Sequence, residues 1–272
     1  MKSIRVIAFL LFCLAIQVKA AGQTMLKTGI QNLPGALPVA AEMDSSIKMA
    51  FDLSKEKFYI SVPKNYSGSQ PFGILVYISP SDDSSELPPG WANVLQEKKL
   101  IFIAPQNVGN NQTVSRRAGL AVVAASKLPE IIKIDTNRVY VAGFSGGARM
   151  ASYASFLRPD LFAGVLAVCG VDFPREVPRV KATKDDKYGF FSLDDKQADE
   201  TKAKVKFVLV TGSKDFRYGN ILDIYKGGFQ KDGYSVKLID VPGMEHTMCS
   251  QKVLIEAFSF LDKKTAVTPG KK

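Results

Sequence analysis

The sequence contains a single histidine, His246, among 272 residues. Metal sites of the zinc and non-haem iron type are mostly built from several histidines, so such a site is excluded here. Any mechanism that needs an imidazole must therefore use His246. Cysteine is also scarce: of Cys13, Cys169 and Cys249, only the last two lie beyond the N-terminal segment described below.

A basic stripe with interleaved aromatic residues, which is typical of nucleic-acid-binding proteins, is also missing. The formal net charge is +10, and it falls to +7 when Lys2, Arg5 and Lys19 are removed with the N-terminal segment. The remaining lysines are scattered among acidic residues, as in residues 181–204. We therefore expect a solvated basic surface and no nucleic-acid partner.

The first 20 residues have the pattern of a secretory signal peptide. Lys2 and Arg5 precede an apolar run over residues 6–18, and small residues follow at Val18 and Ala20. The run is shorter than the roughly 20 residues that a membrane-spanning helix needs. We predict cleavage after Ala20, export to the periplasm or the outside of the cell, and no stable membrane anchor.

Short apolar runs alternate with amphipathic segments in the rest of the chain. With 46% hydrophobic and 23% charged residues, the composition is that of a globular protein. Strands alternating with helices predict an α/β fold, with a mostly parallel sheet covered by helices on both faces. Strands are expected at residues 47–53, 57–62, 72–78, 100–104, 138–142, 162–168, 206–211 and 235–241, and helices at 91–99, 116–125, 148–157, 220–230 and 251–261.

One domain over residues 21–264 accounts for this alternation. Residues 173–204 interrupt it with charges, prolines and an aromatic patch, so we expect a surface insertion that shapes a substrate cleft. Residues 265–272 form a polar tail.

The segment Gly143-Phe144-Ser145-Gly146-Gly147 matches the motif G-x-S-x-G. It directly follows a predicted strand and precedes a predicted helix, which is the context of a nucleophile elbow. The turn is so tight that the residues flanking the serine must lack bulk, which explains the glycines at 143 and 147. We predict that Ser145 is a nucleophile, the alternative being a glycine-rich turn with a bystander serine.

A serine nucleophile needs a base, and the base needs a carboxylate that fixes its tautomer. His246 follows the last predicted strand, and Asp215 follows the strand at 206–211. Because parallel strands point the same way, both loops should emerge at the edge of the sheet that carries Ser145. Asp172, which follows the strand at 162–168, is the rival acid.

Two hydrogen-bond donors should stabilise the oxyanion of an acyl-transfer reaction. The backbone N–H of Gly146 is one candidate, because it comes directly after the nucleophile. The other should lie in the loop after the strand at 72–78, where Pro80 has no N–H. Ser81 is our candidate and Ser79 is second.

Cys169 and Cys249 both lie near the predicted catalytic edge. Cys169 ends the strand after the elbow helix, and Cys249 comes three residues after His246. An exported protein can form disulfides, so a bond between them is one interpretation. Two separate buried thiols are the other.

The order Ser145, Asp215, His246 resembles that of the α/β-hydrolase superfamily. Residues 135–151, which include the elbow, are similar to secreted esterases of the polyhydroxybutyrate depolymerase and feruloyl esterase type, and to the catalytic domain of prolyl-oligopeptidase-like enzymes. Many relatives have His-Gly where this chain has Ser79-Pro80.

The resemblance implies a secreted serine esterase that acts on small or polymeric esters through an acyl-enzyme, without a metal or an organic cofactor. A small serine peptidase of the same fold is the first alternative. The second is a non-enzymatic binding protein on a hydrolase scaffold, because a fold alone does not prove an activity.

Overall fold

The computed structural model describes residues 26–33, 51–181 and 191–263. Within these residues, an eight-stranded sheet has the order β1-β2-β4-β3-β5-β6-β7-β8. The neighbouring strands in the run β4-β3-β5-β6-β7-β8 pair in parallel, whereas the β1–β2 and β2–β4 pairs are antiparallel. The strands are β1 (Gly29–Gln31), β2 (Phe58–Ser61), β3 (Phe72–Ile78), β4 (Leu100–Pro105), β5 (Ile134–Phe144), β6 (Gly164–Val168), β7 (Lys206–Gly212) and β8 (Ser235–Val241).

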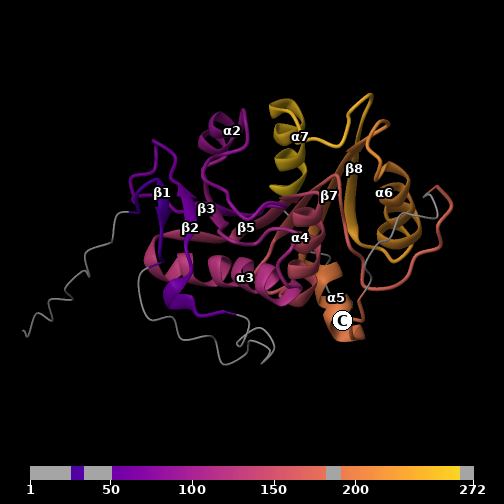
Figure 1. Cartoon of the computed structure of the whole chain (residues 1–272), viewed down its shortest axis with the longest axis horizontal. Coiled ribbons are helices and arrows are strands. Elements are labelled where there is room, and N and C mark those ends of the chain that lie inside the picture. Colours follow the sequence, from indigo (N-terminus) through magenta and orange to yellow (C-terminus); the bar gives the residue numbers. More distant parts are fainter. Residues whose placement is uncertain (1–25, 34–50, 182–190, 264–272) are drawn as a thin grey trace, which may run out of the picture.

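Helices cover both faces of this sheet (Figure 1). Helices α2 and α7 lie on one face, and α3, α4 and α6 pack on the other. The helical elements are η1 (Leu53–Lys55), α2 (Trp91–Glu97), α3 (Val114–Ile131), α4 (Gly146–Leu157), α5 (Asp195–Lys204), α6 (Tyr218–Ile224), η2 (Tyr225–Gln230) and α7 (Gln251–Leu261).

Strand β3 shows why the central strands are apolar along their whole length. Alternate side chains of a strand point to opposite faces. Ile74 and Val76 pack beneath α3 and α4, while Leu75 and Tyr77 pack beneath α2 and α7. Both faces are covered, so every residue of β3 is buried. The predicted α/β architecture is therefore confirmed.

Two local predictions differ from the structure, and one short strand was missed. Of the strand expected at 47–53, residues 47–50 lie outside the described part, and Leu53–Lys55 forms the 3₁₀ turn η1 instead. There the Asp52 side chain accepts a hydrogen bond from the Ser54 N–H, and this local bond competes with a strand. The short edge strand β1 was not predicted. The helix expected at 220–230 ends at Ile224 and continues as the π-helical η2, which contains two glycines.

The segment at 173–204 is not loop alone. Its last part forms the charged helix α5, which begins at the side-chain cap of Asp194. Phe191 packs against Tyr153 and Phe156 of α4, so the described part of the segment lies against the face covered by α4. The predicted signal peptide, residues 1–20, and the predicted tail, 265–272, lie outside the described residues.

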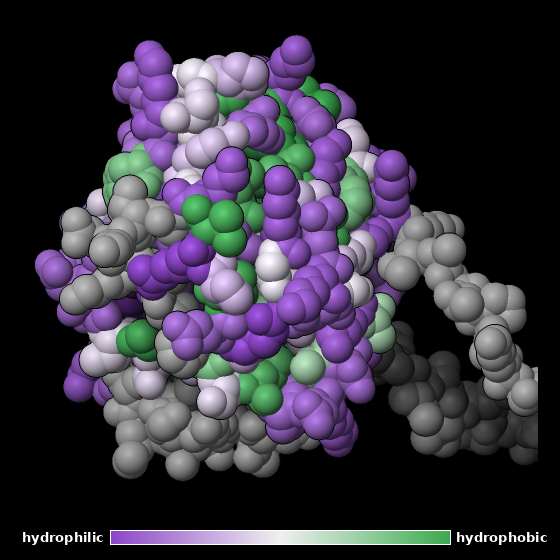
Figure 2. Space-filling view, turned by 90° about the vertical axis from the view of Figure 1, so that its right-hand side faces the viewer, coloured by the Kyte–Doolittle hydropathy of each residue, from purple (hydrophilic) through white to green (hydrophobic). Residues whose placement is uncertain are grey.

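The face of the molecule beside β8 and α6 is mostly hydrophilic (Figure 2). Its apolar side chains form small groups that are separated by polar ones. Within the described ranges, none of the helices combines the length and the apolar character needed to cross a bilayer.

Candidate active site

The turn between β5 and α4 holds Ser145 in a strained conformation. Its φ and ψ angles are 54° and −120°, in a region that residues other than glycine rarely adopt. The Ser145 N–H donates to the Val168 carbonyl at 2.8 Å. A Cβ at Gly147 would overlap the carbonyl oxygen of Ile78, and one at Gly143 would overlap the backbone of Gly147. The two glycines therefore permit the close packing that the sequence motif predicts.

The structure brings the three predicted residues Ser145, His246 and Asp215 together. The Oγ of Ser145 lies 2.9 Å from Nε2 of His246, and Nδ1 of His246 lies 2.7 Å from Oδ1 of Asp215. A carboxylate only accepts hydrogen bonds, so Nδ1 carries the proton and Nε2 is left to accept from the serine. The centres of the phenyl rings of Phe144 and Phe216 lie 5.0 and 4.2 Å from the centre of the imidazole, so both rings pack against it.

Asp215 is buried and well supplied with donors. Its carboxylate accepts from Thr211 Oγ1 at 2.7 Å and from the Arg217 N–H at 2.9 Å, in addition to His246. Burial by itself would raise the pKa of Asp215. The hydrogen bonds from Arg217, His246, Thr211 and Cys169 outweigh burial and hold the pKa below its usual value. Asp215 is therefore an anion under His246 at neutral pH.

Asp172, the rival acid, has another partner. Its Oδ1 accepts from Nε of Arg149 at 2.7 Å, and its N–H donates to Ser152 Oγ. Burial raises the pKa of Asp172, although the charges of Arg149, Arg117 and Arg217 oppose that shift. The geometry thus places Asp215 and not Asp172 against His246.

The structure places the two predicted oxyanion donors, Gly146 and Ser81, in different surroundings. Gly146 begins α4 directly after Ser145, as expected. The Ser81 N–H, however, donates to Oγ of Ser79 at 3.0 Å, so this donor is already engaged within its own loop. A side chain that the sequence analysis missed, Asn110, lies against Gly146, where its amide oxygen would overlap an added Cβ.

The orientation of the Asn110 amide is set by an arginine. Nη2 of Arg117 lies 3.1 Å from Oδ1 of Asn110, and a guanidinium can only donate. The NH₂ group of Asn110 therefore faces away from Arg117. Asn110 also lines the same cavity as Ser145 and Gly146. Its backbone N–H donates to the Pro80 carbonyl at 2.9 Å, which joins the loops that follow β3 and β4.

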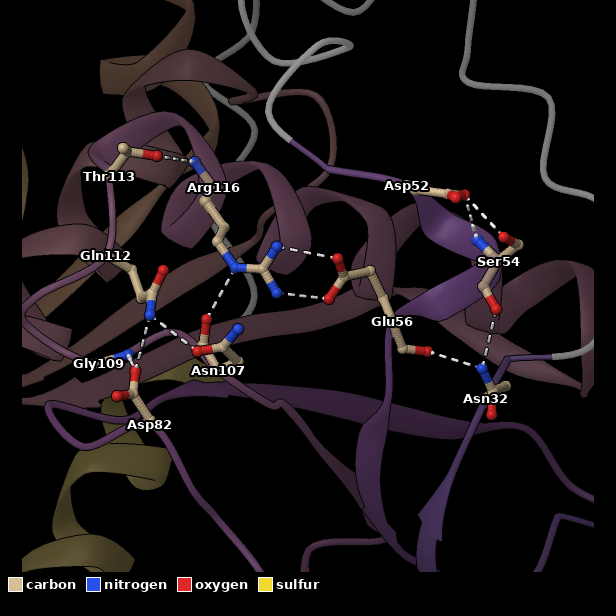
Figure 3. A network of polar contacts seen from close by, with 10 residues as sticks. All are labelled: Asn32, Asp52, Ser54, Glu56, Asp82, Asn107, Gly109, Gln112, Thr113 and Arg116. Carbon is tan, nitrogen blue, oxygen red and sulfur yellow. Dashed lines mark hydrogen bonds and ion pairs between the residues drawn. The ribbon is translucent and has the colours of Figure 1, made fainter.

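A polar network fixes the loop that carries Asn110 (Figure 3). Oδ1 of Asp82 accepts from the Gly109 N–H at 2.9 Å and from the Gln112 side chain at 3.3 Å. Arg116 donates to the Asn107 carbonyl and forms a bidentate ion pair with Glu56, at 2.9 and 2.5 Å. This pair is largely buried, so it ties the loop firmly to the segment before β2.

Of the two interpretations for Cys169 and Cys249, the structure has the second, two separate thiols. Cys169 and Cys249 are both free and buried. The Cys169 thiol faces the Thr247 carbonyl, with Sγ 3.5 Å from that oxygen, and so contacts the loop of His246 by a weak hydrogen bond. Burial raises the pKa of both thiols, that of Cys249 to about 12, which suppresses the reactive thiolate form.

Ligand atoms of Cys169, Asp215 and His246 lie within 4.8 Å of one another, as in some metal sites. The Asp215 carboxylate is, however, already bonded to His246 and Thr211. The short bond between Nδ1 and the carboxylate uses the groups that a metal would need. The arrangement fits a proton relay better than a metal centre.

A cavity of about 280 Å³ opens beside Ser145 and Gly146. Side chains from α3, α4 and the loop after β7 line it. None of the described residues of the segment at 173–204 is among the lining residues, so the expected role of that segment in shaping the cleft remains a prediction.

No protein-family model matches the sequence. A stretch of 90 residues, 28% of this chain, is 31% identical to the poly(3-hydroxybutyrate) depolymerase of Ralstonia pickettii. The match covers 18% of that protein, so most of the relative has no counterpart in the aligned segment.

Solved structures give a wider match. FphF, a fluorophosphonate-binding serine hydrolase of Staphylococcus aureus, is 14% identical with a TM-score of 0.56, over 77% of this chain and 93% of that one. LpqC, the poly(3-hydroxybutyrate) depolymerase of Bordetella parapertussis, is 15% identical with a TM-score of 0.54, over 70% and 78%. Est1E from Butyrivibrio proteoclasticus is 16% identical with a TM-score of 0.53, over 76% and 95%. The chain has the α/β-hydrolase fold.

Proposed function

We propose that the protein is a serine esterase that cleaves carboxylic esters through an acyl-enzyme. The observation that carries this proposal is the continuous hydrogen-bond relay from Ser145 through His246 to Asp215, which starts at a strained elbow. A strained backbone conformation persists only where the surrounding structure holds it in place, and such strain often marks a functional site.

In the proposed reaction, His246 Nε2 takes the proton of the Ser145 hydroxyl as Oγ attacks the ester carbonyl. Asp215 stabilises the imidazolium that results. Collapse of the tetrahedral intermediate breaks the bond to the alcohol oxygen, which receives the proton from Nε2. Water, activated by the same imidazole, then releases the acid and restores Ser145.

We propose the Gly146 N–H and the Asn110 side-chain NH₂ as the donors to the oxyanion. Asn110 lies against Gly146 and lines the same cavity, and Arg117 donates to its amide oxygen, so we propose that its NH₂ group is the one that donates to the reacting carbonyl. The Ser81 N–H is the alternative second donor, and it would first have to leave Ser79 Oγ.

The named activities of the similar proteins favour hydrolysis of esters over hydrolysis of peptides. The curated relative and LpqC are poly(3-hydroxybutyrate) depolymerases, and a ferulic acid esterase is a further structural neighbour with a TM-score of 0.55. A putative dipeptidyl aminopeptidase IV of Bacteroides ovatus also matches, over 76% of this chain and 33% of that one. The peptidase therefore stays the second candidate. Export by the N-terminal segment is part of the proposal and rests on the sequence pattern alone.

A fluorophosphonate probe tests the function directly, because it labels an activated serine irrespective of the substrate. We expect labelling of the native protein and none of Ser145→Ala, together with loss of hydrolysis of 4-nitrophenyl butyrate by a factor of about 10⁶. Matching thermal unfolding curves would show that the variant is folded. Equal labelling of both proteins would contradict the proposal, and hydrolysis of amide but not ester substrates would favour the peptidase.

A further inference from the structure

The two aromatic rings that pack against the imidazole of His246 have different surroundings. Phe144 is partly buried and packs against the hydrophobic cluster on the face of the sheet covered by α2 and α7. Phe216 lies closer to the imidazole, with 4.2 Å between the ring centres, and is 61% exposed. In the described part of the chain, Phe216 belongs to neither cluster of the core. Core packing therefore explains the position of Phe144 but not that of Phe216.

Exposed large apolar side chains are few in the described residues: Ile30, Val114, Val180 and Phe216. A single exposed apolar side chain is common on protein surfaces and by itself indicates nothing. Two of these four, however, lie at the site. Val114 lines the cavity beside Ser145, and Phe216 packs against the imidazole. The position of Phe216, and not its exposure alone, points to contact with a substrate.

A tight turn fixes the ring of Phe216 at the surface. The Arg217 N–H donates to Oδ1 of Asp215 at 2.9 Å, and the Tyr218 N–H donates to the Asp215 carbonyl at 2.9 Å. The guanidinium carbon of Arg217 lies 5.0 Å from the centre of the Phe216 ring. The turn that supplies the acid of the relay thus also holds an aromatic ring, so little conformational freedom would be lost when a ligand contacts it.

The relay indicates which half of an ester lies beside this ring. The imidazole must protonate the alcohol as it leaves, so the alcohol oxygen lies close to Nε2 of His246 in the tetrahedral intermediate. The cavity beside Ser145 has neither His246 nor Phe216 among its described lining residues. Because the ring of Phe216 packs on the imidazole, it lies beside the alcohol half of the substrate and outside the cavity.

We propose that Phe216 is a specificity-determining residue that contacts the alcohol group of the ester, so that esters of apolar, and above all aromatic, alcohols are preferred. This inference rests on the proposed esterase function and names the class of its leaving alcohol. Contact between two aromatic rings removes a large apolar area from water and has preferred edge-to-face and offset geometries. Such a contact would stabilise the bound ester without a closed pocket for the alcohol.

Two esters with the same acyl group test this proposal: methyl butyrate and benzyl butyrate. Methanol and benzyl alcohol have nearly equal acidity, so the leaving-group chemistry is matched and the phenyl ring is the difference. Titration of the released butyric acid at constant pH gives kcat and KM for both esters. We expect kcat/KM of the native protein to be about 10-fold higher for benzyl butyrate.

Variants of Phe216 separate contact with the alcohol from general damage. Phe216→Ala should lower the ratio of the two kcat/KM values to within about twofold of unity, mainly by raising KM for benzyl butyrate. Removal of a ring from beside His246 slows the hydrolysis of both esters alike, and the ratio cancels this effect. Phe216→Tyr keeps an aromatic ring and should keep the native ratio.

Two matched controls lie elsewhere in the described chain. Phe144→Leu alters the other ring on the imidazole, so it should lower kcat/KM for both esters by the same factor and leave the ratio unchanged. Ile30→Ala shortens a similarly exposed apolar side chain on β1, which β2, β4 and β3 separate from β5. It should change neither value.

The outcomes distinguish the two proposals. Hydrolysis of both esters by the native protein with equal kcat/KM would overturn the alcohol contact and leave the esterase intact. A native ratio in Phe216→Ala would also overturn it. So would an equal fall of the ratio in Phe144→Leu, because the rings would then act only by positioning His246. Failure to hydrolyse either ester, with no fluorophosphonate labelling of Ser145, would overturn both proposals.

Discussion

The two edges of the central sheet each carry a cavity, and of these two only the cavity at the carboxyl edge is lined, in the described part of the chain, by non-glycine residues with positive φ, Ser145 and Cys169. The cavity at the amino edge has a volume of about 750 Å³ and is lined by the first residues of β5 and β7 and by the end of α7. The cavity at the carboxyl edge has about 280 Å³. Of the four non-glycine residues with positive φ in the described chain, Asn107, Ser145 and Cys169 follow strands at the carboxyl edge, and Lys99 precedes β4.

Charged groups are also used differently at the two edges. At the amino edge, Asp262 accepts from Arg138 at 3.0 Å and from the Tyr140 hydroxyl at 2.8 Å, so opposite charges sit side by side. At the carboxyl edge, three arginines line one cavity without a lining acid among the described residues. The comparison shows that volume alone does not mark a site. Strained backbone at Ser145 distinguishes the smaller cavity.

The largest effect in this comparison concerns the acid of the relay. Asp215→Asn should lower kcat by about 10⁴-fold, because an amide cannot hold His246 in the tautomer that accepts the serine proton. Asp172→Asn should change kcat only several-fold, because Asp172 bonds Arg149 and not His246. Steady-state kinetics with 4-nitrophenyl butyrate and thermal unfolding measure both. A crippled Asp172→Asn with a mild Asp215→Asn would reverse the assignment.

The relay could be predicted from the sequence because of a simple topological rule. The loops after parallel strands emerge at one edge, so residues 145, 215 and 246 had to lie near one another once β5, β7 and β8 were assigned. The strands themselves were recognisable as continuous apolar runs. The elbow added a local requirement for glycine that the packing of Gly147 against Ile78 explains.

The other half of the site lies in a loop whose course the sequence does not indicate. Asn110 reaches Gly146 because the loop after β4 is tied to Asp82 and Pro80, contacts between residues distant in the chain. One signal was present: Arg117 interrupts the apolar face of the helix expected at 116–125, and a buried arginine needs a reason. The sequence left the pairing of Cys169 and Cys249 open, because a shared edge of the sheet does not fix the distance between two thiols.

A smaller effect is expected from the oxyanion donor. Asn110→Ala should lower kcat by about 10²- to 10³-fold with little change in KM, because the lost hydrogen bond strengthens only as the oxyanion forms. Asn110→Asp keeps the acceptor for Arg117 but removes the donor, and should be equally impaired. Ser81→Pro removes the competing N–H. If Ser81→Pro lowers kcat more than Asn110→Ala does, and its melting temperature equals that of the native protein, the second donor is Ser81.

At the amino edge we expect a change in stability without a change in activity. Tyr140→Phe removes the hydroxyl that donates to Asp262, while the Arg138–Asp262 ion pair stays. The free energy of unfolding, measured in urea, should fall by about 1 kcal/mol. Values of kcat/KM within twofold of the native protein would support the contrast between the edges. A tenfold loss of kcat/KM would mean that a change at the amino edge affects catalysis at Ser145.

The smallest effect is the response of stability to acid, for which Asp215 and Asp172 should have opposite signs. The pKa of Asp215 is lowered in the folded protein, because its hydrogen bonds outweigh burial. A lowered pKa adds stability above the unfolded value, near pH 4, and that stability is lost as the pH falls through the folded value. The pKa of Asp172 is raised by burial, so its contribution is present below the unfolded value and is lost as the pH rises through the folded one.

Urea unfolding of the native protein, Asp215→Asn and Asp172→Asn between pH 2.5 and 7 isolates these two contributions. Relative to Asp215→Asn, the native protein should lose stability as the pH falls below about 4. Relative to Asp172→Asn, the native protein should gain stability as the pH falls from 7 toward about 4, through the raised pKa of Asp172, and this difference should change no further below about 4. The variants share the same change of a carboxyl group to an amide, so general acid effects cancel. If the difference in unfolding free energy from the native protein changes with pH in the same direction for both variants, the pKa shifts of Asp215 and Asp172 do not have opposite signs.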